Sequence, residues 1–456
     1  MHKLLLIGAA AATVVGLGAA TTAGQTPRNE AFRLIGLFGD ALATVERDYV
    51  VPVDDKKLIE AALQGMMGAL DPHSSYLPVK GYDELRERTE GQYSGVGLTI
   101  SSEGGLVKII SPMDGGPAAR AGVQAGDVIS AIDGQNSTGL TVSQVSEKLR
   151  GAAGTSVKVT FLRDGEEPRE VVLTREIIKI DSVTGRVEGD FGVLRISTFN
   201  ENTGRELTET ITRLQGENPA LKGYVLDLRN NGGGLLDAAI AVSDAFLERG
   251  EIVSQRGRRP EQILRYAAGP GDLTGGLPVV VLINYGSASA SEIVAGALKD
   301  HQRATLIGLT SFGKGSVQSV IPLRGGADGA LSITTARYYT PSGASIQKIG
   351  IEPDLEVARS EAEARIVSRS NFIYSEAAYA TALDASIGAE RKGPHTPHEA
   401  PGEAWDEDKD YQLERAYDVL RAGGELTQLA AAPEGIVVTP PGTAMAAVAA
   451  EPDETP

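Results

Sequence analysis

The sequence contains no cysteine and only five histidines, and these shortages exclude several kinds of site. Without cysteine, the chain can form neither disulfides nor thiolate metal sites. The histidines are His2, His73, His301, His395 and His398, and no two of them have the spacing of metal ligands on one helix. We therefore expect no metal and no cofactor, and we interpret the Pro-rich stretch around the last two histidines as a solvated linker.

Basic residues are also in short supply. The chain has 43 Lys and Arg against 60 Asp and Glu, which gives a formal net charge of −17 over 456 residues. Binding a phosphate backbone needs a concentrated basic face, so this balance argues against a nucleic-acid partner. With 41% hydrophobic and 23% charged residues, the composition is typical of a soluble protein of two or three domains.

The N-terminus carries a long uncharged run, from Leu4 to Ala23, after a short basic start. Small residues follow it, which is the layout of a secretory signal with cleavage after Ala20 or Ala23. About 20 residues is also enough for an uncleaved single-span anchor. We expect residues 1–24 to be a signal peptide or anchor, without lipid attachment because no cysteine follows.

The remaining chain changes character several times. The fold class that we expect is multidomain α/β, with its parts assigned by composition and periodicity. The expected segments are an N-terminal helical region (25–90), a β-rich domain (91–178), an α/β core (179–358), a C-terminal helical segment (359–392), and a Pro/Ala/Glu-rich linker and tail (393–456) that contains a short helix around 411–420.

The first helix has an apolar face. Its sequence, FRLIGLFGDALATVERDYV, places Phe32, Ile35, Phe38, Leu42 and Val45 three or four residues apart. This spacing predicts a packing or dimerisation arm. Farther along, strands such as LKGYVLDLR and LPVVVLIN alternate with helical segments, which predicts βαβ units and a largely parallel sheet.

A serine-rich junction follows one of these apolar strands. The strand ends at Ile283, and Ser287, Ser289 and Ser291 stand before the next helix. Loops at the carboxyl ends of parallel strands are where α/β sheets place ligand sites. Ser289 also begins an S-x-x-E capping box, so a purely structural role stays open. As a nucleophile it would benefit from the positive potential of the helix N-terminus.

Two further segments have the composition of an active site. Asn231-Gly232-Gly233-Gly234 follows another strand, and its N–H groups could form an oxyanion hole or only a tight turn. In GLTSFGKGSVQS, the glycines around Lys314 resemble a phosphate-binding loop, but Gly315 replaces the Ser or Thr that holds Mg²⁺. Gln318 lies four residues after Lys314, so both side chains can face one cleft.

A lysine can activate a serine only when its amine is neutral. An ordinary pKa of about 10.4 leaves roughly 0.04% of the amine neutral at pH 7. Burial that lowers the pKa by about 3 units would raise this fraction to roughly a third. The alternative is a surface lysine in a glycine-rich turn.

Together these motifs resemble the C-terminal processing peptidases, or tail-specific proteases. The resemblance rests on YGSASASEIVAGAL, SFGKGSVQ, LDLRNNGGGLL and DPHSSYL, and on a PDZ-like stretch, GVGLTI…SPMDGGPAARAGVQAGDVISAIDG. It runs from about residue 32 to residue 353, with the motifs in the order of the family. The resemblance implies a PDZ domain at 91–178, a crotonase-like α/β protease core and an exported serine endopeptidase.

The resemblance also implies roles for individual residues. Ser289 matches the nucleophile, Lys314 the general base, and Gln318 the residue that orients the lysine. The backbone N–H groups of Ala290 and Gly233 match the oxyanion hole. The family pattern Asn-Pro-Gly-Gly has glycine here in place of proline, which leaves the donating glycine open.

In the PDZ-like region, the N–H groups of Val96, Gly97 and Leu98 match the loop that captures a C-terminal carboxylate. The implied partners are protein or peptide substrates with free C-termini, a second copy of the chain contacted through terminal helices, and an adaptor protein. The implied location is periplasmic or otherwise extracytoplasmic, with membrane association if the N-terminal segment is retained.

Two other functions fit parts of the sequence. Ser311-Phe312-Gly313-Lys314 spells the S-x-x-K motif of penicillin-binding enzymes, but that motif needs a helix and K-T-G is absent. The chain could also be a catalytically inactive exported PDZ scaffold, although every candidate catalytic residue is present.

Overall fold

The computed structural model describes most of the chain. The described residues are 26–103, 105–163, 165–369, 375–385, 391, 393, 395–402, 405–406, 408–424, 426 and 435–436. The expected signal segment at 1–24 and most of the expected tail lie outside them. The chain divides into two compact units, 1–66 and 67–456, and each is described by itself.

Helix α1 (Thr26–Asp48) dominates the first unit, and α2 (Asp55–Gly68) begins there. Both lie in the predicted N-terminal helical region, and α1 carries the apolar residues from whose spacing it was predicted. The apolar side chains of α1 face solvent, since Phe32 and Ile35 are each 65% exposed. Among the described residues, no helix combines the length and apolar character that crossing a bilayer requires.

The second unit begins with a short turn and a β-rich domain. The β-rich domain has its own core, in which Val107, Ile129, Val145 and Phe161 are buried. Its main sheet has the order β3-β4-β5-β7-β8, which leaves β3 at an edge. The elements, with α3 before them, are α3 (Val79–Glu90), β2 (Gln92–Gly95), β3 (Leu98–Glu103), β4 (Leu106–Pro112), α4 (Pro117–Arg120), β5 (Val128–Ile132), β6 (Gln135–Asn136), α5 (Val142–Leu149), β7 (Ser156–Leu162), β8 (Arg169–Thr174) and β9 (Glu176–Lys179).

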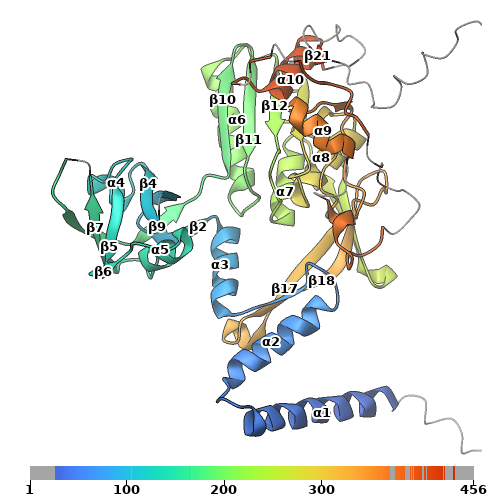
Figure 1. Cartoon of the computed structure of the whole chain (residues 1–456). Coiled ribbons are helices and arrows are strands. Elements are labelled where there is room, and N and C mark those ends of the chain that lie inside the picture. The colour runs from blue at the N-terminus through green and yellow to red at the C-terminus, as the bar shows by residue number, and fades with distance from the viewer. Residues whose placement is uncertain are drawn as a thin grey trace, which may run out of the picture. The chain divides into compact units, whose positions relative to one another are not determined.

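The α/β core is built on a six-stranded sheet (Figure 1). The strand order is β10-β11-β12-β15-β16-β19, and every pair except β10–β11 is parallel. This arrangement confirms the predicted parallel sheet. Its elements are β10 (Val183–Glu188), β11 (Phe191–Ile196), α6 (Thr203–Glu217), β12 (Gly223–Asp227), α7 (Leu236–Asp244), β15 (Val279–Ile283), α8 (Ala290–Asp300), β16 (Ala304–Gly308) and β19 (Leu355–Glu356).

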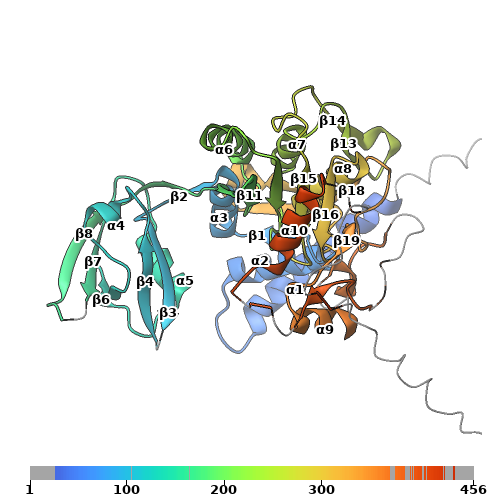
Figure 2. The same cartoon turned by 90° about the horizontal axis from the view of Figure 1, so that it is seen from above.

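The central strands are buried on both faces, as parallel strands usually are. Leu226 and Val281 face one side, where they pack with α6, α7 and α8. Val225 and Val280 alternate with them and face the other side. That second face is covered by α10 (Tyr411–Arg421), which lies along β15 and β16 in Figure 2. The short helix within the expected tail is therefore part of the core.

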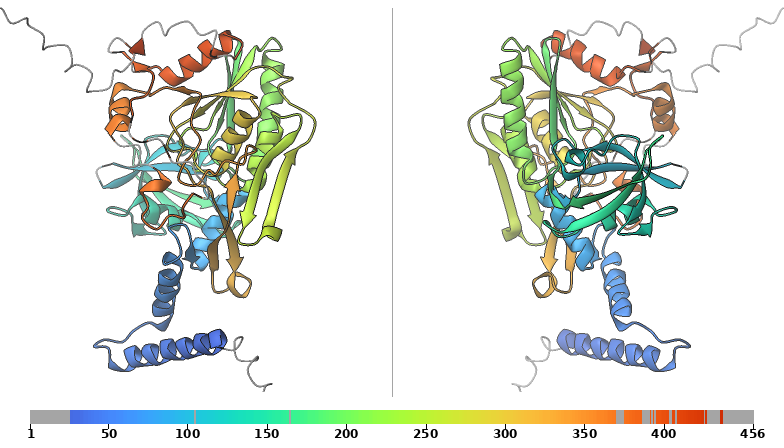
Figure 3. Two further views of the ribbon diagram at one scale, coloured as in Figure 1. Left: turned by 90° about the vertical axis from the view of Figure 1, so that its right-hand side faces the viewer. Right: turned by 90° about the vertical axis from the view of Figure 1, so that its left-hand side faces the viewer.

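A second sheet supplies the other wall of the site. Its order is β1-β18-β13-β14, with β17 paired to β18. The β17–β18 hairpin, drawn in light orange, is visible in Figure 3. The strands are β1 (Ser75–Leu77), β13 (Gly250–Gly257), β14 (Ile263–Ala268), β17 (Ser316–Pro322) and β18 (Ala330–Tyr339), with 3-10 turns η1 (Pro260–Gln262) and η2 (Leu323–Gly326).

The C-terminal helical segment is shorter than predicted. Helix α9 (Glu361–Arg369) ends well before residue 392, and residues 375–385 contain only the 3-10 turn η3 (Glu376–Ala378). Strands β20 (Ala400–Pro401) and β21 (Gly435–Ile436) pair with each other. His395 was expected in a solvated linker, but its Nε2 lies 2.8 Å from Glu356 Oε1.

The end of β12 is joined to α10 by a partly buried ion pair. Arg229 donates to Asp227 and to both carboxylate oxygens of Asp410, at 2.9 and 2.6 Å. Asp410 is also the N-cap of α10, accepting from the N–H of Leu413. Burial acts to raise the pKa of Asp410, but the hydrogen bonds and charge of Arg229 lower it below its ordinary value.

We expect Asp410→Ala to lower the free energy of unfolding by about 2–3 kcal/mol, through loss of the cap and of a charge partner. Because the pKa of Asp410 is lowered, its stabilising effect is present above about pH 4 and is lost as the pH falls through the folded-state value. Urea denaturation at several pH values measures both effects. The exposed Asp408→Ala is the control, and equal losses in the two variants would contradict the assignment.

Candidate active site

The structure separates the three serines that follow β15. Ser287 and Ser291 are fully buried, and their hydroxyls donate to the carbonyls of Leu228 and Asn231, at 2.8 and 2.9 Å. Neither hydroxyl proton is available for chemistry. Ser289 is only half-buried, so a substrate can reach it.

Ser289 has an unusual backbone. Its φ of 56° and ψ of −110° lie in a region that non-glycine residues rarely adopt. Such strain is maintained only where the surroundings impose it, and it concentrates at functional sites. Ser289 is the N-cap of α8, as predicted, so it lies at the positive N-terminal end of an 11-residue helix.

The fully buried carboxylate of Glu292 explains how this backbone is held. Glu292 accepts from the N–H of Ser289 at 2.7 Å, which is half of the predicted capping box. It also accepts from Ser311 Oγ and from the N–H groups of Gly313 and Lys314, at 2.6, 2.6 and 2.9 Å. The Glu292 side chain therefore binds the backbone of both the loop that carries Ser289 and the loop that carries Lys314. Burial raises the pKa of Glu292 to about 7, although all four hydrogen bonds act to lower it.

The glycine loop after β12 packs directly on the serine. Gly233 has a φ of +97°, and a Cβ built on it would lie 2.7 Å from Ala288 O and 2.9 Å from Ala290 N. The loop is tied down by Asn231, whose carbonyl accepts from the N–H of Ala288. The two expected oxyanion donors, Ala290 and Gly233, are thus neighbours.

One of these two donors is not free. The N–H of Gly233 donates to Asn231 Oδ1 at 2.9 Å. Among the described residues, no acceptor is bonded to the N–H of Ala290. For Gly233 to bind an oxyanion, its N–H has to break the hydrogen bond to the side-chain oxygen of Asn231.

Lys314 lies just before β17, in a loop with no regular structure, and its side chain is half-buried. Burial lowers the pKa of Lys314, while the charges of Glu376, Glu292 and Asp71 act to raise it. The net change is in the direction that a neutral base requires. Neither Glu376 nor Asp71 was assigned a role from the sequence.

Gln318 lies on β17, opposite Thr334 on β18. Its Nε2 donates to Ser316 Oγ at 3.0 Å and to Thr334 Oγ1 at 3.1 Å. Thr334 in turn donates to Asp71, which also bears on Lys314. Asp71 therefore acts on Lys314 and is linked to Gln318 through Thr334.

A second buried network supports the lysine loop from the C-terminal side. Gln347 accepts from the N–H of Gly315 at 3.0 Å and donates to Glu376 at 2.9 Å. His73 Nε2 lies 2.7 Å from the other carboxylate oxygen of Glu376. These contacts join DPHSSYL to a segment 303 residues away, and only the quoted motif gave a signal for them.

The S-x-x-K interpretation fails on geometry. Residues 309–315 form no helix, and Ser311 is fully buried. Its hydroxyl donates to Glu292 and accepts from the N–H of Ile351 at 2.6 Å. The interpretation of this stretch as a phosphate-binding loop fails too, because the strand β17 follows it instead of a helix.

The expected carboxylate-binding loop joins β2 to β3. The carbonyls of Val96 and Gly97 accept from the N–H groups of Ala118 and Met113. Among the described residues, nothing accepts from the N–H of Val96 or of Gly97. The loop thus opens onto β3 with unused donors, and β3 is an edge strand to which a peptide can add.

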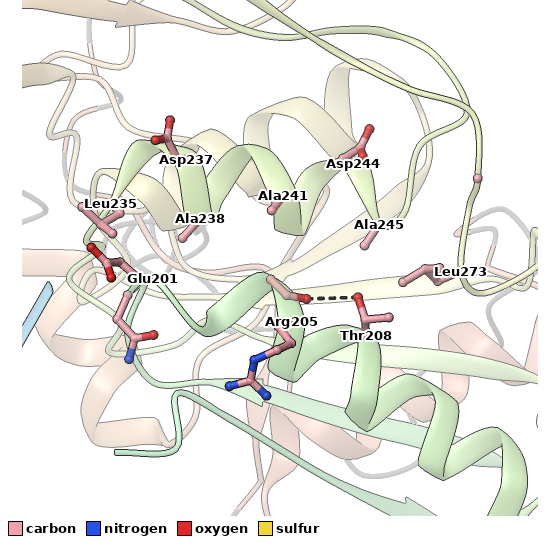
Figure 4. Close-up of a pocket in the computed structure, with 13 residues that line it drawn as sticks. Glu201, Arg205, Thr208, Leu235, Asp237, Ala238, Ala241, Asp244, Ala245 and Leu273 are labelled. Atoms are coloured by element: carbon pink, nitrogen blue, oxygen red, sulfur yellow. Dashed lines mark hydrogen bonds between the residues drawn. The ribbon is translucent and has the colours of Figure 1, made fainter. Parts of the chain in front are cut away.

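A cavity of about 670 Å³ lies between α6 and α7 (Figure 4). Ala238 and Ala241 line it from α7, with the acidic side chains of Asp237 and Asp244 beside them. It adjoins the glycine loop at Leu235 but contains none of the candidate catalytic residues.

Two family models match the chain. The model described as Peptidase family S41 matches residues 190–357, and the PDZ domain model matches residues 108–163. A carboxy-terminal-processing protease of Bartonella bacilliformis is 46% identical over 419 residues, which cover 90% of this chain and 93% of the relative. The chain belongs to the carboxy-terminal processing proteases.

Other members of this protease family are more distant. A carboxyl-terminal-processing protease of Synechocystis is 38% identical over 312 residues, which cover 66% of this chain and 72% of the relative. Among solved structures, a photosystem II D1 C-terminal processing protease is 33% identical, with a TM-score of 0.42 over 78% of this chain and 99% of that one. The family models and the sequence relatives show a serine-type peptidase with a PDZ domain, and the sheets described above form its mixed α/β core.

Glu292→Gln tests whether this protease needs the buried clamp. Glutamine has the same size, but each carboxylate oxygen of Glu292 accepts from two donors, so the NH₂ group must face two of the four. We expect a loss of about 2–3 kcal/mol in stability and of at least about tenfold in kcat. Ser311→Ala removes only one of the four donors to Glu292, together with the acceptor of the Ile351 N–H, and should cost less in kcat. A fully active and stable Glu292→Gln variant would contradict the role of the clamp.

Proposed function

We propose that the protein is an exported serine endopeptidase that recognises protein C-termini and cleaves with Ser289 as nucleophile and Lys314 as general base. Gln318 orients the lysine. The observation that carries the proposal is the clamp by Glu292, which holds the backbones of a strained, accessible serine and a half-buried lysine through one carboxylate.

The reaction is acyl transfer. The neutral amine of Lys314 takes the proton from Ser289 Oγ, and the oxygen forms a bond with the carbonyl carbon of the scissile peptide. The resulting ammonium gives its proton to the leaving amine when the C–N bond breaks. A water, deprotonated by the same lysine, then releases the acyl group and restores the serine.

The negative charge on the tetrahedral carbonyl oxygen develops at the N-terminus of α8. The N–H of Ala290 and the positive end of the helix favour that charge. Gly233 becomes the second donor if substrate displaces the amide of Asn231. The absence of a side chain at Gly233 lets its backbone lie directly against Ala288 and Ala290.

Substrate selection is assigned to the PDZ domain. A terminal carboxylate accepts from the N–H groups of Val96, Gly97 and Leu98, while the peptide backbone extends the sheet at β3. The unused donors of Val96 and Gly97 support this assignment. An internal peptide segment has no terminal carboxylate to satisfy them.

The remaining parts of the proposal concern location and assembly. Residues 1–24 direct export, as a cleaved signal or a retained anchor, which places the enzyme outside the cytoplasm. The exposed apolar side chains of α1, including Phe32 and Ile35, supply a surface for a second copy of the chain. A separate adaptor protein is a further candidate partner.

The test uses an unfolded protein substrate with either a free or an amidated C-terminus, and the full chain with and without Ser289→Ala. We expect the free terminus to be cleaved at least about tenfold faster, because the amide removes the charge that the loop binds. Electrophoresis and mass spectrometry follow the products. Binding without cleavage, or cleavage that survives Ser289→Ala, would overturn the proposal.

A further inference from the structure

A chain of polar side chains runs from the turn after α2 to the candidate active site. Asp71 is 3% exposed and accepts from the N–H groups of His73 and Ser74. Thr334 Oγ1 donates to Asp71 Oδ1 at 3.0 Å. Gln318 Nε2 then donates to Thr334 Oγ1 at 3.1 Å.

The hydrogen atoms that these side chains can donate allow only one set of hydrogen-bond directions. Burial acts to raise the pKa of Asp71, but hydrogen bonds from Ser74, His73 and Thr334 lower it below the ordinary value, so the carboxylate is ionised and can only accept. Thr334 has a single hydroxyl proton, which it donates to Asp71 in a hydrogen bond. Thr334 Oγ1 can therefore only accept from Gln318.

An amide side chain has one donor end and one acceptor end. Because Thr334 and Ser316 both take up the NH₂ group of Gln318, its Oε1 is the end left for other partners. An acceptor suits Lys314, because it can hold an N–H of the amine and leave the lone pair for the proton of Ser289. A reversed amide would instead donate into that lone pair and block the base.

We propose that Asp71 and Thr334 are positioning residues that fix the orientation of the Gln318 amide and thereby keep the Lys314 amine ready to act as a base. This inference rests on the proposed function. It gives the DPHSSYL motif a physical task, since the motif supplies the carboxylate on which the orientation depends.

The hydroxyl of Thr334 provides the first test. Thr334→Val keeps the shape of the side chain on β18 but removes the acceptor, so the amide of Gln318 is free to rotate. We expect kcat on an unfolded protein substrate to fall about tenfold to a hundredfold, with KM changed by less than about twofold. Thr334→Ser restores the hydroxyl and should recover most of kcat.

A matched control lies next to it on the same strand. Thr335 is exposed, and its hydroxyl contacts Ser319, so Thr335→Val makes the same chemical change away from the cleft. Wild-type activity that is lost in Ser289→Ala must be present first, since its absence would refute the proposed function itself. If that activity is present but Thr334→Val matches Thr335→Val, or Thr334→Ser fails to recover, only the positioning role is overturned.

The pH profile supplies a readout that a merely structural role would not move. Three carboxylates act to raise the pKa of Lys314, namely Glu376 (paired with His73), Glu292 and Asp71. Asp71→Asn removes one of these negative charges and leaves the other two groups in place. Losing an opposite charge lowers the pKa of an amine, so the acid limb of kcat/KM should move to lower pH by about half a unit or more.

The same Asp71→Asn variant should also have a lower plateau kcat, because asparagine can donate to Thr334 and so permits the reversed amide. A thermal melt shows whether each variant is folded at the assay temperature. A lower plateau with an unmoved acid limb would overturn the inference, as would an unchanged plateau.

Discussion

Replacing Lys314 by methionine is expected to reduce kcat/KM on an unfolded protein substrate by about 10³-fold, because Ser289 loses its base. Methionine keeps the unbranched shape of the side chain, and the position is half-buried. The fold should not weaken, since the variant no longer buries a charged amine. Loss of activity without loss of stability is the combined result that identifies a catalytic base.

The direction of the pKa change gives this prediction a second readout. Burial lowers the pKa of Lys314 in the folded protein, against the charges of Glu376, Glu292 and Asp71. The folded state therefore releases this proton before the unfolded state does. The wild-type free energy of unfolding should gain a contribution as the pH rises from the lowered value toward about 10.4, and Lys314→Met should lack it.

Lys348→Met is the matched control. Lys348 lies on the neighbouring loop, where its N–H donates to Gly313 O, and its ammonium pairs with the exposed Asp384. We expect its activity to stay within about threefold of wild type, since surface ion pairs contribute little. A similar loss in both lysine variants would indicate that general loop damage, and not loss of a base, causes the effect.

Gly233→Ala is expected to cause the second large effect, a loss of at least about a hundredfold in kcat. An added Cβ would lie 2.7 Å from Ala288 O and 2.9 Å from Ser289 Cβ, and a φ of +97° disfavours any side chain. The loop must then move away from the serine, and the oxyanion hole is lost with it. Steady-state kinetics on the purified full chain measure the change.

Gly232→Ala serves as the comparison. Gly232 is exposed, and a Cβ there would meet no atom within 4 Å. This variant should remain within about twofold of wild-type activity, since it keeps the backbone N–H and adds no clash. If both alanines were tolerated, the close packing of the glycine loop on Ser289 would be irrelevant to turnover.

Much of the site could be predicted because it obeys local rules. Apolar strands that alternate with helices imply a parallel sheet, and the carboxyl ends of its strands bring the loops after β12 and β15 together. The resemblance implied that Gly233 and Ala290 share one site, and the structure has the two residues side by side. The S-x-x-E pattern also predicted the N-cap of α8 correctly.

The rest depends on contacts between distant segments. Asp71 accepts a hydrogen bond from Thr334, which lies 263 residues later in the chain. Short polar stretches have no periodicity from which such a contact could be predicted. The engagement of the Gly233 N–H by Asn231 depends on the conformation of one side chain. Neither could be deduced from residue types and spacing.

One error could have been avoided. Helix α10 was expected within a linker and tail, because Pro-rich sequence precedes it. However, β12 and β15 are apolar at successive positions, so both faces of the sheet need a cover. Helices α6, α7 and α8 supply one cover, and the second had to come from elsewhere in the chain.

The measurement that tests the central mechanism most directly is the rate at which a fluorophosphonate modifies the protein at different pH values, followed by intact mass and peptide mapping. We predict a single adduct on Ser289, formed at a rate that rises with pH around a midpoint below the ordinary lysine pKa. In Lys314→Met that titration should disappear and the rate should fall. An adduct on another residue, or the same pH profile in both proteins, would contradict the assignment of Lys314 as the base for Ser289.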